Sequence, residues 1–208
     1  MDRHFQSVVL AVAVVAAAGG CNRVKEAREA AEEAQARAEE AAAVKLEAME
    51  LERVGEGERV ETSQFAGKPW LLLAFRAGDA VCREAVGEWN GLAEAAQGVG
   101  GHLVAVVTDV EAGGEASAEA SAEALEVAGA ARFPVCAATR AQLDALKERA
   151  AMEVNPVAYL FDGAGRLARA TEGHARLEHH AADLEALAEG RELPEHPAQG
   201  VLPEENDP

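Results

Sequence analysis

Gly67-Lys68-Pro69-Trp70-Leu71-Leu72-Leu73-Ala74-Phe75 is the stretch that decides the fold of this sequence. Its first three residues are typical of a turn, and the apolar run that follows predicts a strand buried on both faces. The next segment, Cys82 to Gln97, places Val86, Trp89 and Ala93 on one side of a helix. A buried strand that leads into an amphipathic helix is typical of an α/β domain.

Further strands and helices alternate along the rest of the domain, which we place at 58–190. The expected elements are a strand over 102–108, a loop and helix over 111–124, a strand over 133–136, a helix over 140–152, strands over 157–161 and 166–170, and a helix over 177–188. Thr139 is placed to cap the helix at Arg140, and Asp162-Gly163-Ala164-Gly165 predicts a hairpin turn. This order predicts an α/β fold with a mixed central sheet, parallel in its middle and antiparallel at the final hairpin.

The charge of the chain excludes one class of partner. The 208 residues carry a formal net charge of −18. Nucleic-acid binding needs clustered Lys and Arg to replace the counterions of the phosphates, so we expect no nucleic-acid partner. An acidic surface also disfavours attachment to anionic lipid headgroups through a basic face.

The N-terminus indicates export. The apolar run Val8–Ala18 is shorter than the roughly 20 residues of a spanning helix, but it fits the core of a signal peptide. It leads into Ala18-Gly19-Gly20-Cys21, which resembles the lipobox of bacterial lipoproteins. This resemblance implies removal of residues 1–20, lipidation of Cys21 and a cell-envelope location facing the periplasm or the cell surface. Asn22 stands where an inner-membrane retention signal has Asp, which favours the outer membrane; an ordinary cleaved signal is the alternative.

A spacer follows the predicted anchor, over 21–54. Its Arg23–Arg53 stretch contains neither Gly nor Pro and is rich in Ala, Glu, Lys and Arg, which predicts a helical stalk about 45 Å long. Alanines recur at alternating spacings of four and three residues, so a single charged helix and a coiled-coil oligomer both remain open. Gly55 and Gly57 are expected to end this helix. The acidic, proline-containing tail 191–208 is expected to be disordered.

Three segments of the domain resemble extracytoplasmic thioredoxin-like proteins of the redoxin type. They are Thr62–Leu73, Phe75–Glu84 and Val154–Arg166, within a resemblance that covers 60–190. This group includes peroxiredoxins and the membrane-anchored thioredoxins of cytochrome maturation. The resemblance implies that a strand delivers a Cys-x-x-Cys motif to a helix start. It also implies that Pro156 follows a cis bond and faces the active site.

The first cysteine of that motif is missing. With Cys82 aligned to the second cysteine, Asp79 occupies the place of the attacking one, or Ala80 does if the alignment slips by one residue. Neither side chain can attack a disulfide, because the attacking group must be a thiolate. Asp79 at a helix cap would also disfavour a neighbouring thiolate.

Three interpretations of Cys82 therefore stay open. It is an inert, partly buried thiol, or a single reactive cysteine assisted by Arg76 or Arg83, or the disulfide partner of Cys136. The third follows because lipidation of Cys21 leaves two thiols in an oxidising compartment.

Histidines cluster at His174, His179 and His180, with His102 elsewhere, and we expect them to be solvated rather than to bind metal. We expect neither a metal nor a cofactor. The leading hypothesis is a membrane-anchored protein of the thiol–disulfide redox and antioxidant class, with weakened, single-cysteine or lost activity. If it is active, Cys82 supplies the sulfur, Pro156 shapes the substrate groove and envelope thiols or disulfides are the partners. The alternative is a non-catalytic binding or structural module of the envelope.

Overall fold

The computed structural model describes residues 46–113, 118–149, 154–173 and 177–196. The predicted signal peptide, Cys21, the predicted stalk up to residue 45, His174 and the tail after 196 lie outside the described residues. The elements are η1 (Leu46–Ala48), β1 (Glu50–Arg53), β2 (Arg59–Glu61), η2 (Thr62–Phe65), β3 (Trp70–Phe75), α2 (Ala80–Glu84), α3 (Val86–Gly98), β4 (His102–Glu111), α4 (Ala118–Ala130), β5 (Val135–Ala138), α5 (Arg140–Arg149), β6 (Val157–Phe161), β7 (Leu167–Glu172) and α6 (Leu177–Ala188). Throughout these residues, no helix combines the length and the apolar character needed to cross a bilayer.

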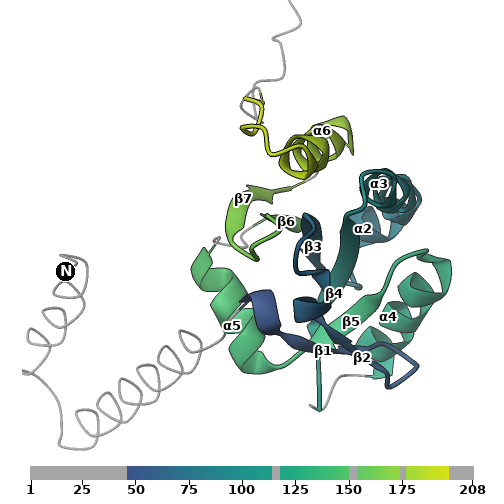
Figure 1. Ribbon diagram of the computed structural model, residues 1–208. Helices are drawn as coiled ribbons and strands as arrows, with labels where there is room; N and C mark the ends of the chain where they lie inside the picture. Colours follow the sequence, from purple (N-terminus) through teal and green to yellow (C-terminus); the bar gives the residue numbers. More distant parts are fainter. Residues whose placement is uncertain (1–45, 114–117, 150–153, 174–176, 197–208) are drawn as a thin grey trace, which may run out of the picture. The chain divides into compact units, whose positions relative to one another are not determined.

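The strands form one mixed sheet in the order β2-β1-β5-β4-β3-β6-β7 (Figure 1). The central strands β3, β4 and β5 are parallel, and β6, β7 and the β1–β2 hairpin pair antiparallel. The expected α/β fold with a parallel middle and an antiparallel final hairpin is confirmed. The strand 70–75, the strand 157–161 and the helix 177–188 also have the expected bounds.

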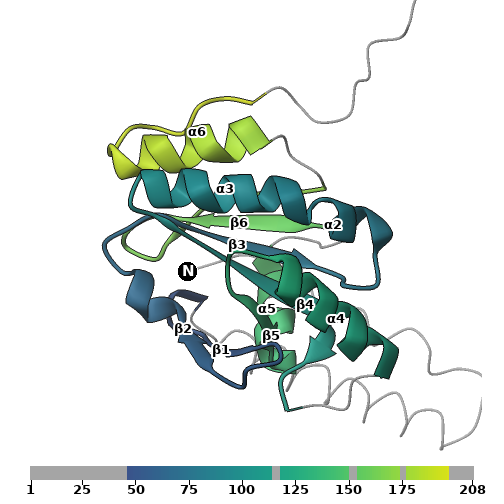
Figure 2. The same ribbon diagram turned by 90° about the vertical axis from the view of Figure 1, so that its right-hand side faces the viewer.

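Each face of the sheet carries its own hydrophobic core. One face packs α2, α3, α4 and α6, through side chains such as Trp89, Val127 and Leu184. The opposite face packs η1, η2 and α5, through side chains such as Phe65 and Leu146. Figure 2 shows α3 and α6 side by side over β3 and β6. All six residues of β3 are buried, which explains its uninterrupted apolar sequence, since each Leu or Phe side chain contributes about 1.5–3 kcal/mol on burial.

Local hydrogen bonds fix two of the predicted boundaries. The backbone N–H of Thr139 donates to Gln142 Oε1 at 2.8 Å, and the N–H of Gln142 donates to Thr139 Oγ1 at 3.4 Å. This reciprocal pair starts α5 at Arg140, as expected. In the β6–β7 turn, Asp162 Oδ1 accepts the N–H groups of Ala164 and Arg166, each at 2.9 Å.

The predicted end of the helical stalk at Arg53 is wrong. Residues 46–48 form a 3-10 turn, and Glu50–Arg53 is strand β1 inside the sheet, so the folded unit begins before the expected 58. Met49 and Leu51 are buried in the core on the face that packs η1, η2 and α5. The buried Thr62 side chain fixes the start of this segment, because Thr62 Oγ1 accepts the N–H of Met49 at 2.8 Å and donates to the carbonyl of Leu46 at 3.0 Å. Packing against β2 and β5 overrides the helix propensity of this segment.

Several other boundaries shift. The helix expected over 82–97 is divided at Ala85 into α2 and α3, β4 extends to Glu111, and β5 and β7 begin later than expected.

The tail expected to be disordered from 191 is ordered as far as 196, because hydrogen bonds attach it to the domain. Arg169 Nη2 donates to the carbonyl of Pro194 at 2.7 Å, and His196 contacts the buried Asp183 carboxylate at 2.8 Å.

Candidate functional site

The predicted site residues come together where β3 ends and β6 begins, at one end of the strands, which we call the cis-proline edge. Ala74 near the end of β3 pairs with Val157 at the start of β6, so the segments beyond them leave the sheet side by side. One of these segments runs through Arg76–Asp79 into α2, and the other contains Pro156. The Asn155–Pro156 bond is cis, as expected, and the buried Pro156 accepts a 2.7 Å hydrogen bond from the N–H of Gly173.

The loop between β3 and α2 is fixed by groups from β4 and α4. Asp109 Oδ1 accepts the N–H of Ala77 at 3.0 Å, and Asp109 Oδ2 accepts the N–H of Gly78 at 2.9 Å. Arg83 Nη1 donates to the carbonyl of Ala77 at 2.9 Å and to Glu123 Oε1 at 3.1 Å. Asp109 and Glu123 cannot be linked to this loop from the sequence, because they come from elements more than 30 residues further along the chain and no motif spacing connects them to it.

Asp79 is the N-cap of α2. Its backbone is extended, and its Oδ1 accepts the N–H of Val81 at 2.9 Å. The carboxylate therefore occupies the exposed start of the helix, where a thiolate would be stabilised by the helix N-terminus and open to a substrate. The structure thus places Asp79 at the helix cap, where its charge lies near the Cys82 thiol.

Cys82 lies within the core on the face of the sheet that packs α2, α3, α4 and α6, and it is 0 % exposed. Burial raises the pKa of the Cys82 thiol to about 11, and the nearby Asp79 and Asp109 carboxylates add to this rise, while a hydrogen bond from the Arg76 backbone opposes it. Roughly one thiol in ten thousand is then ionised at pH 7. Arg83 is engaged by Ala77 and Glu123. This environment favours an inert thiol.

The structure does not bring Cys136 to Cys82. Both thiols are free and buried, but Cys82 belongs to the core on one face of the sheet and Cys136 to the core on the other. Burial raises the pKa of Cys136 to about 12. The disulfide alternative is therefore contradicted by this structure.

The expectation that the histidines are solvated is wrong for His180. Its side chain is 7 % exposed, and burial lowers its pKa to about 4. His179 and His196 stack at 4.3 Å between ring centroids, and His102 stacks on Phe65 at 4.7 Å. Across 46–196, outside the undescribed gaps, no three potential metal ligands converge.

No family model matches the chain, and no curated protein matches its sequence. Solved structures do match its fold. The exposed lipoprotein thioredoxin of Streptococcus pneumoniae is 19 % identical with a TM-score of 0.50, over 63 % of this chain and 93 % of that one. A thioredoxin-family thiol:disulfide interchange protein of Chlorobium tepidum is 15 % identical with a TM-score of 0.53, over 71 % and 94 %. An uncharacterised conserved protein of Geobacillus kaustophilus is 20 % identical with a TM-score of 0.56, over 74 % and 85 %.

The chain has a thioredoxin-like fold. Its thioredoxin-like edge keeps the cis-proline and the helix that starts beyond β3, but that helix begins with a carboxylate, and its one cysteine is buried. At this edge a cis-proline, a capping carboxylate and a buried thiol therefore lie on neighbouring segments.

Proposed function

We propose that this chain is a lipid-anchored, extracytoplasmic thioredoxin-like protein that has lost dithiol exchange and binds an envelope polypeptide non-covalently at its cis-proline edge. One observation carries the proposal. The only sulfur near that edge among the described residues is Cys82, which is fully buried with a pKa of about 11, and Asp79 occupies the helix start. A site with these side chains would keep the shape of a thioredoxin-like site and would lack an accessible thiolate.

Exposed apolar groups support a binding role. In the described residues, Val81 and Val154 are two of three large hydrophobic side chains that are strongly exposed, at 58 % and 53 %. Val81 lies in the first turn of α2, and Val154 lies two residues before Pro156, so both belong to segments beyond the same sheet edge. Exposed apolar groups on a preorganised surface are typical of interaction sites.

The anchor and the location rest on the sequence. Ala18-Gly19-Gly20-Cys21 carries the proposal of lipidation, and Asn22 carries the preference for the outer membrane. The pneumococcal structure with the same fold is described as an exposed lipoprotein. Acyl chains on Cys21 would supply the membrane attachment that an acidic chain lacks.

Alkylation kinetics test the loss of reactivity. The full chain is treated with iodoacetamide at pH 7, with and without urea, and the modified cysteines are identified by mass spectrometry. We expect Cys82 to react at least about a hundredfold more slowly in the folded chain than in urea, because the folded protein buries the sulfur and suppresses the thiolate. Cys136, buried on the other face, is the internal control and should behave alike.

A single-cysteine redox function is the second candidate. It is favoured by the position of Cys82, one helical turn after Asp79 and beyond the same edge as the cis-proline. Rapid alkylation of Cys82 alone, or oxidation of Cys82 by dilute peroxide while Cys136 stays reduced, would select this function and contradict the first proposal.

A further inference from the structure

After α6 the chain reverses and runs back along that helix, as a returning segment over 191–196. The N–H of Arg191 donates to the carbonyl of Ala186 at 2.8 Å, which starts the reversal. At the other end of the segment, the His196 ring stacks on His179, the third residue of α6. Figure 2 shows the returning segment passing over α6 towards the end of the domain where α2 lies. The chain at His196 has therefore come back to the start of α6.

The start of α6 adjoins the cis-proline edge. Gly173 directly follows β7, and its N–H donates to the carbonyl of Pro156 at 2.7 Å. A Cβ on Gly173 would lie 3.5 Å from Val154 Cγ1, so the exposed Val154 side chain is close to this point. His179 is only six residues from Gly173, a stretch that spans at most about 20 Å. The returning segment thus brings the chain to the neighbourhood of Val154.

The residues after His196 have the composition of a ligand for such an edge. Residues 197–208 lie outside the described residues, and their sequence contains the apolar run Val201-Leu202-Pro203. Six extended residues, from 197 to 202, span about 20 Å, so the run can reach Val154 from His196.

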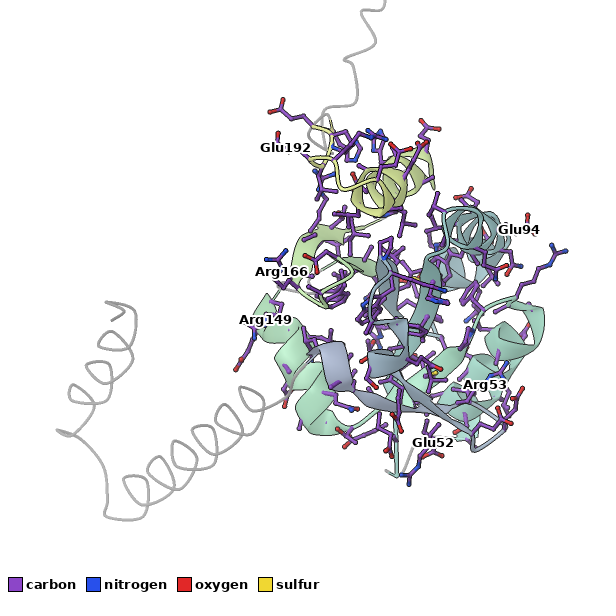
Figure 3. The ribbon with its side chains drawn as sticks, viewed as in Figure 1. Glu52, Arg53, Glu94, Arg149, Arg166 and Glu192 are labelled. Atoms are coloured by element: carbon purple, nitrogen blue, oxygen red, sulfur yellow. The ribbon has the colours of Figure 1, made fainter. Side chains whose placement is uncertain are left out.

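The tripeptide Leu202-Pro203-Glu204 also repeats a tripeptide of the returning segment, Leu193-Pro194-Glu195. In the first copy, Leu193 packs against the core that contains Trp89 and Leu184, and the carbonyl of Pro194 accepts a 2.7 Å hydrogen bond from Arg169 Nη2. Figure 3 shows the neighbouring Glu192 at the surface of the domain. An apolar contact and an arginine that donates to a backbone carbonyl therefore hold the first copy.

The cis-proline edge offers the same two kinds of partner. Val154 supplies the exposed apolar side chain. Arg76 lies just beyond the end of β3, which pairs with the start of β6, so it leaves the same end of the paired strands. Its side chain is exposed, and it forms no ion pair within the part of the chain that the structure describes. Asp79 and Asp109, by contrast, already accept backbone N–H groups.

We propose that Val201-Leu202-Pro203 occupies the cis-proline edge of its own chain, so that an envelope polypeptide must displace it in order to bind. Leu202 packs on Val154, and the carbonyl of Pro203 accepts a hydrogen bond from Arg76. The regulation of binding rests on the proposed function, whereas the contact itself can be measured without an envelope partner.

The test uses the purified full chain labelled with ¹⁵N and follows the amides of Gly78 and Gly173 by NMR. The double substitution Val201→Ser, Leu202→Ser should shift both amides, because it frees the edge. A synthetic peptide with the sequence of residues 197–208 should bind this variant with a dissociation constant on the order of 1 mM. It should bind the original chain about fivefold more weakly, since the tethered copy competes at an effective concentration in the millimolar range. Ala198→Ser, in the same tail, is the control and should behave as the original chain does.

A further substitution locates the contact. Added to the double variant, Val154→Ser should abolish peptide binding, and Leu125→Ser, which removes another exposed apolar side chain, should leave it unchanged. Native dispersion of the remaining amides shows that each variant is folded.

Two results would overturn the inference: equal affinity of the peptide for the original chain and the double variant, or unchanged Gly78 and Gly173 amides in that variant. Either result leaves the proposed function standing if Cys82 is unreactive. Rapid alkylation of Cys82 together with the expected amide shifts would instead overturn the proposed function and support the tail contact.

Discussion

The Asp109 carboxylate accepts a 2.9 Å hydrogen bond from the backbone N–H of Gly78, and so ties the irregular part of β4 to the loop that precedes α2. Its other oxygen accepts the N–H of Ala77. A Cβ at Gly78 would approach Glu123 Oε2 to 3.1 Å, so the loop is confined from α4 as well. The loop is therefore a fixed part of the edge.

Asp109→Asn should loosen this loop. A single amide oxygen cannot accept both N–H groups in place of two carboxylate oxygens, so we expect a loss of about 1–3 kcal/mol in the free energy of unfolding. Faster hydrogen exchange at Ala77 and Gly78 is the local measurement. Asp144→Asn, on the partly solvated face of α5, is the control and should change stability by less than about 0.5 kcal/mol. Unchanged exchange at both amides would contradict the role of Asp109.

Asp79→Cys should restore dithiol chemistry. The substitution places a thiol at the exposed N-cap of α2, one turn before Cys82, where the helix N-terminus stabilises a thiolate. We expect an intramolecular disulfide and measurable insulin reduction with dithiothreitol, at a cost of about 1 kcal/mol for the lost cap. The matched variant Ala80→Cys tests the alternative alignment and should remain inactive. Activity in Ala80→Cys alone would show that the alignment slips by one residue.

The buried His180 should make the domain sensitive to acid. Its pKa is lowered from 6.5 to about 4 by burial, so the folded state favours the neutral imidazole. Its contribution is fully present above pH 6.5 and is lost as the pH falls towards 4, and it amounts to about 3 kcal/mol. Denaturant unfolding at several pH values measures it. His180→Leu should flatten the slope in this window, and His179→Gln, a less buried neighbour, should keep it.

Asp183 should be needed for the docking of residues 191–196. Its side chain is 1 % exposed and contacts Arg169 Nη1 at 2.7 Å and His196 at 2.8 Å. Asp183→Asn removes the charge and leaves Arg169 with only the Pro194 carbonyl and no carboxylate, so we expect about 3 kcal/mol of destabilisation. Faster tryptic cleavage after Arg191 would report release of the segment. Glu185→Gln, exposed on the same helix, is the control and should be cleaved at the original rate.

Cys21 should carry the lipid. Cells that express the full chain and are fed an alkyne-labelled fatty acid should yield a labelled protein in the membrane fraction. Cys21→Ser should lose both the label and the membrane association. A labelled Cys21→Ser protein, or an unlabelled original chain in the membrane fraction, would contradict lipidation.

The central strands can be predicted from the sequence because their signals are local: the six apolar residues of β3 identify a buried strand. The cis bond before Pro156, which the structure contains, follows instead from the resemblance of its segment to thioredoxin-like proteins. Asp79 stands directly before the helix that it caps, so its place can be considered from the sequence, but only the structure shows the hydrogen bond to Val81.

Other features depend on contacts between distant segments. Glu50–Arg53 has a helix-forming composition, and a period of two over four residues is too short to oppose it, so β1 is evident only once β2 and β5 lie beside it. Asp109 and Glu123 come to the loop from other elements. The burial of His180, beside a charge network that includes Asp183 and His196, likewise cannot be inferred from its neighbours in sequence.

The place of β1 has a mechanical consequence. A pull on the chain from its N-terminal side reaches Leu46 and then β1, and β1 is an interior strand paired with both β2 and β5. The bonds of Thr62 to Met49 and Leu46 must also break before the strand can move. Tension applied to the segment before Leu46 would therefore load both strand pairs of β1 at once, and the domain would resist extension at its first strand.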